Sequence, residues 1–143
     1  MILTNEEIEQ FVYDALAPLL SKEQGQGVIS GDLYPEDCRP LDSREEDAVI
    51  AVGTGFAEQI QSGRVRLNIY VPDIDNGTGR KVKDKNRCEA VSKLDTEIVQ
   101  LLNDADTDYR WKLFQTTATF AEPEIEQHFV NVNLQFERVT FNT

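Results

Sequence analysis

The sequence is poor in the residues that most often bind metals or form cross-links. Its 143 residues include two cysteines and one histidine, too few for a zinc site of ordinary ligand spacing. Cys38 and Cys88 lie far apart in the sequence and no secretion signal accompanies them, so we expect two free thiols in a reducing compartment. The sequence therefore predicts no metal site, no cofactor and no disulfide framework.

Long apolar runs are also absent. No stretch approaches the roughly 20 apolar residues of a membrane-spanning helix, and the first residues, Met-Ile-Leu-Thr-Asn-Glu-Glu, lack the basic segment of a signal peptide. We therefore expect a protein that is neither membrane-bound nor secreted. The length and the 40% of hydrophobic residues predict a single globular domain over 1–143.

Basic residues are scarce and unevenly placed. The net charge is -12, and residues 1–50 carry 12 acids and 3 bases, whereas residues 51–100 carry 7 acids and 8 bases. A field this negative repels phosphate backbones, so we expect no specific nucleic-acid binding. The densest basic cluster consists of Arg80, Lys81, Lys83, Lys85 and Arg87.

Two segments show the alternation of a strand with one buried face. The first runs over 63–72, in the middle of the chain, where Gly63 opens it and Pro72 ends it, and we expect it to be the central strand. The second runs over 128–141. The apolar positions of the two are Val65, Leu67, Ile69, Val71, Val130, Val132, Leu134 and Phe136. Because each has a polar face, the other side of the sheet is expected to meet solvent or another subunit.

Two amphipathic helices are predicted. The first covers 3–20 and begins with a capping box formed by Thr4 and Glu7, and Pro18 is expected to kink it or to end it near Ala17. The second covers 87–103, with Asn86 as its cap and apolar residues recurring on one face.

Three further strands are expected, over 28–34, 48–52 and 109–120. The first is interrupted by a bulge near Gly31, the second is buried on both faces, and the third forms a hairpin with 128–141. An acidic loop at 35–47 and a basic loop at 73–87 separate these elements. The order predicts an α+β fold, with a single mainly antiparallel or mixed sheet of four to five strands and two amphipathic helices packed on one face.

Acidic residues cluster in two places without completing a known metal motif. The sequence Asp73-x-Asp75-x-Gly77 begins like a calcium loop, but it lacks the fifth-position ligand and the glycine that follows it, so a solvated turn is expected. A nuclease-like group of Asp42, Glu45, Glu46 and Asp47 has no acid–x–Lys pair after it and would face an unfavourable field for a nucleic-acid substrate. Neither cluster is expected to bind a metal.

His128 and Cys88 are the remaining candidates for chemistry. A general base needs a positioned partner, and the sequence identifies none for His128, which we expect at a strand end. Cys88 lies near the start of the second helix, where the helix dipole could lower the pKa of its thiol. No supporting His or Asn pattern accompanies it, so we expect a packing residue, and we predict no catalytic residue.

The opposite charges of the two loops indicate a contact between copies of the chain. The basic run could meet the acidic loop of a neighbouring copy, and such head-to-tail association closes into a ring when the rotation permits; the alternative is a mobile loop kept soluble by its charge. The interface candidates are Arg80, Lys81, Lys83, Lys85, Arg87, Asp42, Glu45 and Glu46.

Taken in order, these elements resemble the tail-terminator (tail-completion) proteins of long-tailed bacteriophages, minor tail proteins that cap the tail tube. The resemblance covers nearly the whole chain and rests on the order of elements, so no single residue is assigned as a family site. The matching pieces are the helix at 6–20, the Val-Ile-x-x-x-Leu-Tyr-Pro segment at 28–35, the strands at 48–52 and 65–71, the helix at 87–103 and the hairpin ending at 129–141.

The resemblance implies a non-enzymatic structural protein of a phage or prophage. Such proteins form a ring, commonly hexameric, on the end of the tail tube and join it to the head–tail connector, in the virion tail or in the cytoplasm of the bacterial host. One alternative is a small α+β ligand-binding or enzymatic domain, and another is an adaptor that binds a partner through its sheet edge. The residues expected to line a ligand pocket are Trp111, Phe114, Phe120, Phe129 and Phe136.

Overall fold

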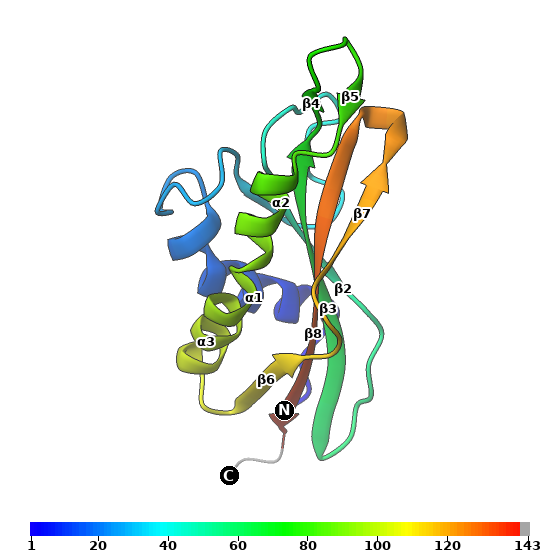
Figure 1. The fold of residues 1–143 in the computed structure, drawn as a ribbon. Coiled ribbons are helices and arrows are strands. Elements are labelled where there is room, and N and C mark those ends of the chain that lie inside the picture. Colours follow the sequence, from blue (N-terminus) through cyan, green and yellow to red (C-terminus); the bar gives the residue numbers. More distant parts are fainter. Residues whose placement is uncertain (141–143) are drawn as a thin grey trace.

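A computed structural model describes residues 1–140 and has an α+β architecture (Figure 1). One mixed sheet of six strands forms a layer, and helices cover one of its faces. The predicted class is confirmed, but the sheet is larger than the four to five strands expected. The elements are α1 (Asn5–Leu20), β1 (Leu33–Tyr34), β2 (Ala48–Val52), β3 (Ile60–Pro72), β4 (Ile74–Asp75), β5 (Lys81–Val82), α2 (Lys85–Ser92), α3 (Asp95–Ala105), β6 (Tyr109–Leu113), β7 (Ala118–Glu122), the 3-10 turn η1 (Pro123–Ile125) and β8 (Gln127–Val139).

The long strands β3 and β8 form the centre of the sheet. They pair antiparallel from Ile60↔Val139 to Pro72↔Gln127, along the whole of both strands. The strand order is β1-β2-β3-β8-β6, and β7 pairs with the other half of β8. Within residues 1–140, β1 and β2 are the one parallel pair. The prediction of a central strand that ends at Pro72 is confirmed.

Alternation in the two long strands separates a buried face from an open face. The apolar positions predicted for β3 and β8 are at most 2% exposed and pack beneath α1, α2 and α3. The intervening positions lie on the side of the sheet away from the helices, which we call the open face. Strand β2 follows the same rule: Ile50 is buried and Val49 is only half-buried, so the prediction that this strand is buried on both faces is wrong.

Helix α1 has the predicted start but a different end. The Thr4 hydroxyl accepts from the Glu7 N–H at 3.2 Å, and the Glu7 carboxylate accepts from the Thr4 N–H at 3.0 Å, which confirms the capping box. Pro18 lies inside the helix, which continues to Leu20. The helix does not end near Ala17, because burial of Leu19 and Leu20 at 1% exposure compensates for the hydrogen bond that Pro18 cannot make.

The second predicted helix is divided into α2 and α3. At Leu94 the backbone N–H bonds to the Val91 carbonyl, three residues back, and this tighter turn separates the two helices. The cap of α2 is Asp84, whose carboxylate accepts from the Arg87 N–H at 3.2 Å. Asn86 is therefore the second residue of α2, and its predicted role as the cap is wrong.

The other predicted strands are shorter in the structure. Of the 28–34 strand only Leu33–Tyr34 pairs with β2, and Gly31 marks a close approach in place of a bulge. A Cβ on Gly31 would lie 2.0 Å from an Asp47 carboxylate oxygen, so a larger residue does not fit there. The 109–120 strand is split into β6 and β7, which pair with successive halves of β8.

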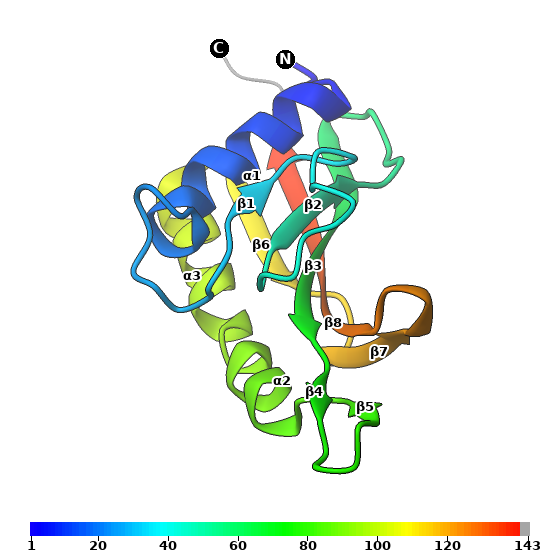
Figure 2. The same ribbon diagram turned by 90° about the horizontal axis from the view of Figure 1, so that it is seen from above.

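The basic loop at 73–87 contains a small hairpin of its own. Strands β4 and β5 pair through Ile74↔Val82 and Asp75↔Lys81. The hairpin projects from the sheet at the top of Figure 1, and in Figure 2 it lies at the end of the molecule away from α1. The Asp75 carboxylate accepts from the N–H groups of Gly77 and Gly79 at 2.7 and 3.1 Å. These two bonds hold the turn and lower the pKa of the Asp75 carboxyl.

Candidate interaction surfaces

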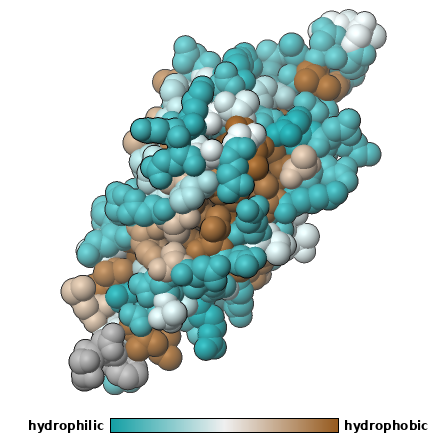
Figure 3. Space-filling model, turned by 90° about the vertical axis from the view of Figure 1, so that its left-hand side faces the viewer, coloured by the Kyte–Doolittle hydropathy of each residue, from teal (hydrophilic) through white to brown (hydrophobic). Residues whose placement is uncertain are grey.

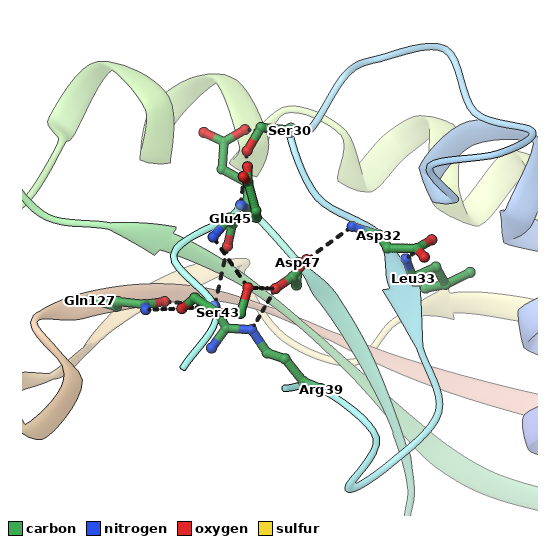
Figure 4. A network of polar contacts seen from close by, with 9 residues as sticks. Ser30, Asp32, Leu33, Arg39, Ser43, Glu45, Asp47 and Gln127 are labelled. Atoms are coloured by element: carbon green, nitrogen blue, oxygen red, sulfur yellow. Dashed lines mark hydrogen bonds and ion pairs between the residues drawn. The ribbon is translucent and has the colours of Figure 1, made fainter. Parts of the chain in front are cut away.

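The acidic 35–47 loop is held to the sheet by the carboxylate of Asp47, which is 1% exposed. It accepts from Arg39 Nε at 2.8 Å, from the Ser43 hydroxyl at 2.5 Å and from the Asp32 N–H at 3.0 Å. Figure 4 shows these donors converging on Asp47. Because a buried carboxylate requires such partners, Asp47 serves the loop's structure and is not available to a metal or a partner.

Arg39 connects the same network to Gln127, the first residue of β8. Its Nη2 donates to Gln127 Oε1 at 2.8 Å, and Gln127 Nε2 donates to the Ser43 carbonyl at 2.8 Å. The Arg39 guanidinium also lies 4.1 Å from the centre of the Tyr70 ring. The loop therefore covers one end of the open face.

Glu46 and Arg87, two of the predicted interface residues, bind each other within the chain. Arg87 Nε and Nη2 reach the two Glu46 carboxylate oxygens, each at 2.7 Å, in the two-point geometry that favours guanidinium–carboxylate pairs. Hydrogen bonding to Glu46 raises the pKa of the Arg87 guanidinium. The Ser30 N–H also donates to Glu46 at 3.1 Å. These two residues consequently do not need a neighbouring copy to satisfy their charges.

The other predicted interface residues remain at the surface. Asp42 and Glu45 are exposed in the loop. Within residues 1–140 no ion pair involves a base of the β4–β5 hairpin. The exposed bases there and at the adjoining start of α2 are Arg80, Lys81, Lys83 and Lys85. We call these four the basic hairpin.

His128 has a partner that the sequence did not reveal. Its Nδ1 lies 2.7 Å from Asp73 Oδ1, and the two side chains are 20% and 9% exposed. Since 55 residues separate them, no local pattern could have indicated the pair. The pair also gives the Asp73 carboxylate a partner within the chain. The rest of the Asp73-x-Asp75-x-Gly77 segment is an exposed turn held by the Asp75 carboxylate.

A second basic surface lies on the uncovered end of the open face. The register places Lys112 of β6 and Arg64 of β3 on either side of Gln135, in one row across three strands. Arg66 and Arg110 lie on the same face, in adjacent rows. All four bases are exposed and, within residues 1–140, none has an ion pair. These four bases are not among the interface residues predicted from the sequence, although their alternation with buried residues along the strands was the available signal.

The five aromatic residues expected to line a pocket are divided between the two faces. Trp111 and Phe136 are buried on the helix side, with ring centres 5.0 Å apart. Phe114 and Phe120, 38% and 47% exposed, lie on the other side, and Phe120 contacts Phe129 there, with ring centres 5.6 Å apart. The expected pocket is therefore not formed by these residues.

Both cysteines are free thiols, as expected. Cys38 is exposed, whereas Cys88 is buried in α2, and burial raises the pKa of the Cys88 thiol above its ordinary value. Cys88 is 4% exposed and packs in the hydrophobic core. Within the described part of the chain, no group of three or more His, Cys, Asp or Glu side chains could hold a metal ion.

Comparison with models of known protein families and with curated proteins found no match for this sequence. Among the helices of residues 1–140, none combines the length and apolarity needed to cross a bilayer. The surfaces described above therefore supply the physical basis for a functional proposal.

Proposed function

We propose that this chain is a non-enzymatic structural protein that forms a ring on the end of a phage or prophage tail tube. In this role it resembles a tail terminator, and its partners are further copies of itself, the tube and the head–tail connector. A ring of this kind works in the virion tail, or in the cytoplasm of the bacterial host during assembly. The hexamer is the symmetry expected from the resemblance.

The basic hairpin is the observation that carries the proposal. Its four exposed bases project from a chain of net charge -12, at the end of the molecule away from α1 (Figure 2). The surface of opposite charge is the acidic 35–47 loop, in which Asp42 and Glu45 are exposed. Surfaces of opposite charge at separate places on one chain suit head-to-tail contact between copies.

The division of the aromatic residues argues against the alternative of a small ligand-binding or enzymatic domain. A ligand site is normally a concave pocket that gathers apolar and polar groups. Here Trp111 and Phe136 complete the core, and Phe114 and Phe120 lie on the opposite side of the sheet. An assembly role is therefore better supported than a ligand-binding or enzymatic one.

Negative-stain electron microscopy combined with light scattering tests the proposed function. The protein is examined over a concentration series, with and without about millimolar Mg²⁺, since divalent ions shield like charges. Closed rings of uniform size support the proposal and give the symmetry directly. Open filaments, or monomers under every condition, would count against a ring-forming protein, and a ligand screen would then follow.

A further inference from the structure

The uncovered end of the open face presents bases at a defined spacing. Arg64 and Lys112 flank Gln135 in one row, and two strand separations place these bases about 10 Å apart at the backbone. Both side chains are exposed. At this end of the open face, the strands β3, β6 and β8 carry a single acid, Glu137, which lies opposite Arg110. The row is thus a positively charged strip with an amide at its centre.

Helix α1 presents a row of the opposite charge on its solvent side. Glu6, Gln10 and Asp14 are all exposed and follow one another at four-residue intervals, so they lie along one line of the helix. Eight residues of helix separate Glu6 from Asp14 by about 12 Å. Gln10 donates to the Asp14 carboxylate at 2.9 Å, which leaves the second carboxylate oxygen open to another donor.

We propose that the open face of one copy docks against the outer row of α1 of a second copy. Arg64 and Lys112 face Glu6 and Asp14, and Gln135 faces Gln10. The spacing of the two rows and their opposite charge support this pairing. The proposal rests on the proposed function only for the closure of such contacts into a ring.

The position of the two surfaces determines the symmetry of the contact. Helix α1 packs its apolar stripe on the buried side of the sheet, so its acidic row belongs to the helix side, which is mostly hydrophilic around an apolar band (Figure 3). The basic row belongs to the open face, on the other side of the sheet (Figure 1). The contact is therefore heterologous, and repeated copies close into a ring or extend as a filament.

Single-stranded nucleic acid is the other polyanion that a basic sheet could attract. Such binding uses free aromatic rings on which bases stack. Here the Arg64 guanidinium lies 3.5 Å from the centre of the Phe114 ring. Because the aromatic ring beside the basic row already carries a guanidinium, the surface favours a protein carboxylate over a nucleobase.

Paired charge reversal tests the docking. One variant carries Arg64→Glu and Lys112→Glu, and the other carries Glu6→Lys and Asp14→Lys; all four side chains are exposed, so both variants should fold, as circular dichroism would verify. Light scattering after size exclusion, up to about 1 mM protein, measures association. We expect each variant alone to associate at least tenfold more weakly than the original chain, and an equimolar mixture to recover association. The control variant carries Lys22→Glu and Lys93→Glu, which change the net charge by as much as the sheet variant (Arg64→Glu with Lys112→Glu) but lie outside both rows.

Four outcomes would overturn the docking proposal: a monomeric original chain at every concentration, a sheet variant that associates normally, a mixture that fails to recover, or a control that loses association equally. If rings persist in the sheet variant, the docking fails while the ring function stands. If the original chain forms open filaments that charge reversal abolishes, the docking stands while the ring function fails. Normal association together with lost binding to a single-stranded oligonucleotide would assign the open face to nucleic acid.

Discussion

At the residue scale, Asp47 has the largest structural role in the 35–47 loop. Its carboxylate is buried, and its three donors come from Arg39, Ser43 and the Asp32 backbone. Arg39 is itself mostly buried, at 11% side-chain exposure. Removing one member of such a pair costs more than the pair contributes, because the other charge is left without a partner.

Replacing Asp47 with alanine should therefore lower the free energy of unfolding by about 3 kcal/mol or more. Urea denaturation followed by circular dichroism would measure this loss. Asp42→Ala, in the same loop but exposed, should change the free energy by no more than about 0.5 kcal/mol. Equal effects of the two substitutions would contradict the assignment of Asp47 as the anchor.

Tyr109 should make stability depend on alkaline pH. It is 5% exposed, and burial raises the pKa of its hydroxyl to about 12. A raised folded-state pKa means that the neutral form contributes stability below the unfolded pKa of about 10, and this contribution is lost as pH rises toward 12. Tyr109→Phe should abolish that part of the loss, worth about 2 kcal/mol. Urea denaturation on both sides of pH 10 measures it, and an equally steep loss in the variant would refute the prediction.

At the scale of elements, the pair β3–β8 organises the sheet. Both strands alternate between core and open face along thirteen residues each, so a one-residue slip would expose every core side chain at once. The same alternation places the basic row and the core on opposite sides of one strand pair.

Val132→Asp should unfold the domain, because Val132 is 0% exposed and the substitution places an unpaired charge in the core. The expected loss exceeds about 4 kcal/mol. The matched control is Gln135→Glu on the open face, between the exposed bases Arg64 and Lys112, which should leave unfolding cooperative. A Val132→Asp protein that remains folded and cooperative, as judged by thermal unfolding, would show that this face is not the core.

Reversal of the basic hairpin tests its role as an interface. Lys81→Glu, Lys83→Glu and Lys85→Glu together should weaken self-association about tenfold, since exposed charge pairs contribute up to about 1 kcal/mol each. The three side chains are exposed, so the fold should be unchanged. Light scattering measures the association, and an unchanged value would exclude the hairpin from the contact.

At the scale of the whole molecule, charge is segregated. Acids gather on α1 and bases gather on the hairpin and the open face, so association between copies should depend on ionic strength. Raising salt from about 0.05 to about 0.5 M should weaken it, because exposed charges are screened within a few ångströms at high salt. Light scattering across this range checks the effect. Association that is independent of salt would indicate an apolar interface instead.

Local patterns in the sequence account for the elements that were predicted correctly. The capping box of α1 involves residues three apart, and the alternation of β3 and β8 repeats every two residues, so both can be read directly along the chain. No glycine or proline lies near Leu94, where the second predicted helix divides into α2 and α3, so no local signal indicates the division. The end of α1 beyond Pro18 depends on the burial of Leu20, which is a tertiary effect.

The sequence by itself determined the α+β class, the central strand, the core-facing residues of β3 and β8 and the overall separation of charge, because periodicity and composition are local quantities. Only the tertiary structure decided which charges are satisfied. It paired Glu46 with Arg87 across 41 residues and Arg39 with Gln127 across 88, and it left the bases of the hairpin and the open face exposed. Contacts between distant residues depend on how the strands are ordered in space, and no pattern along the chain encodes that order.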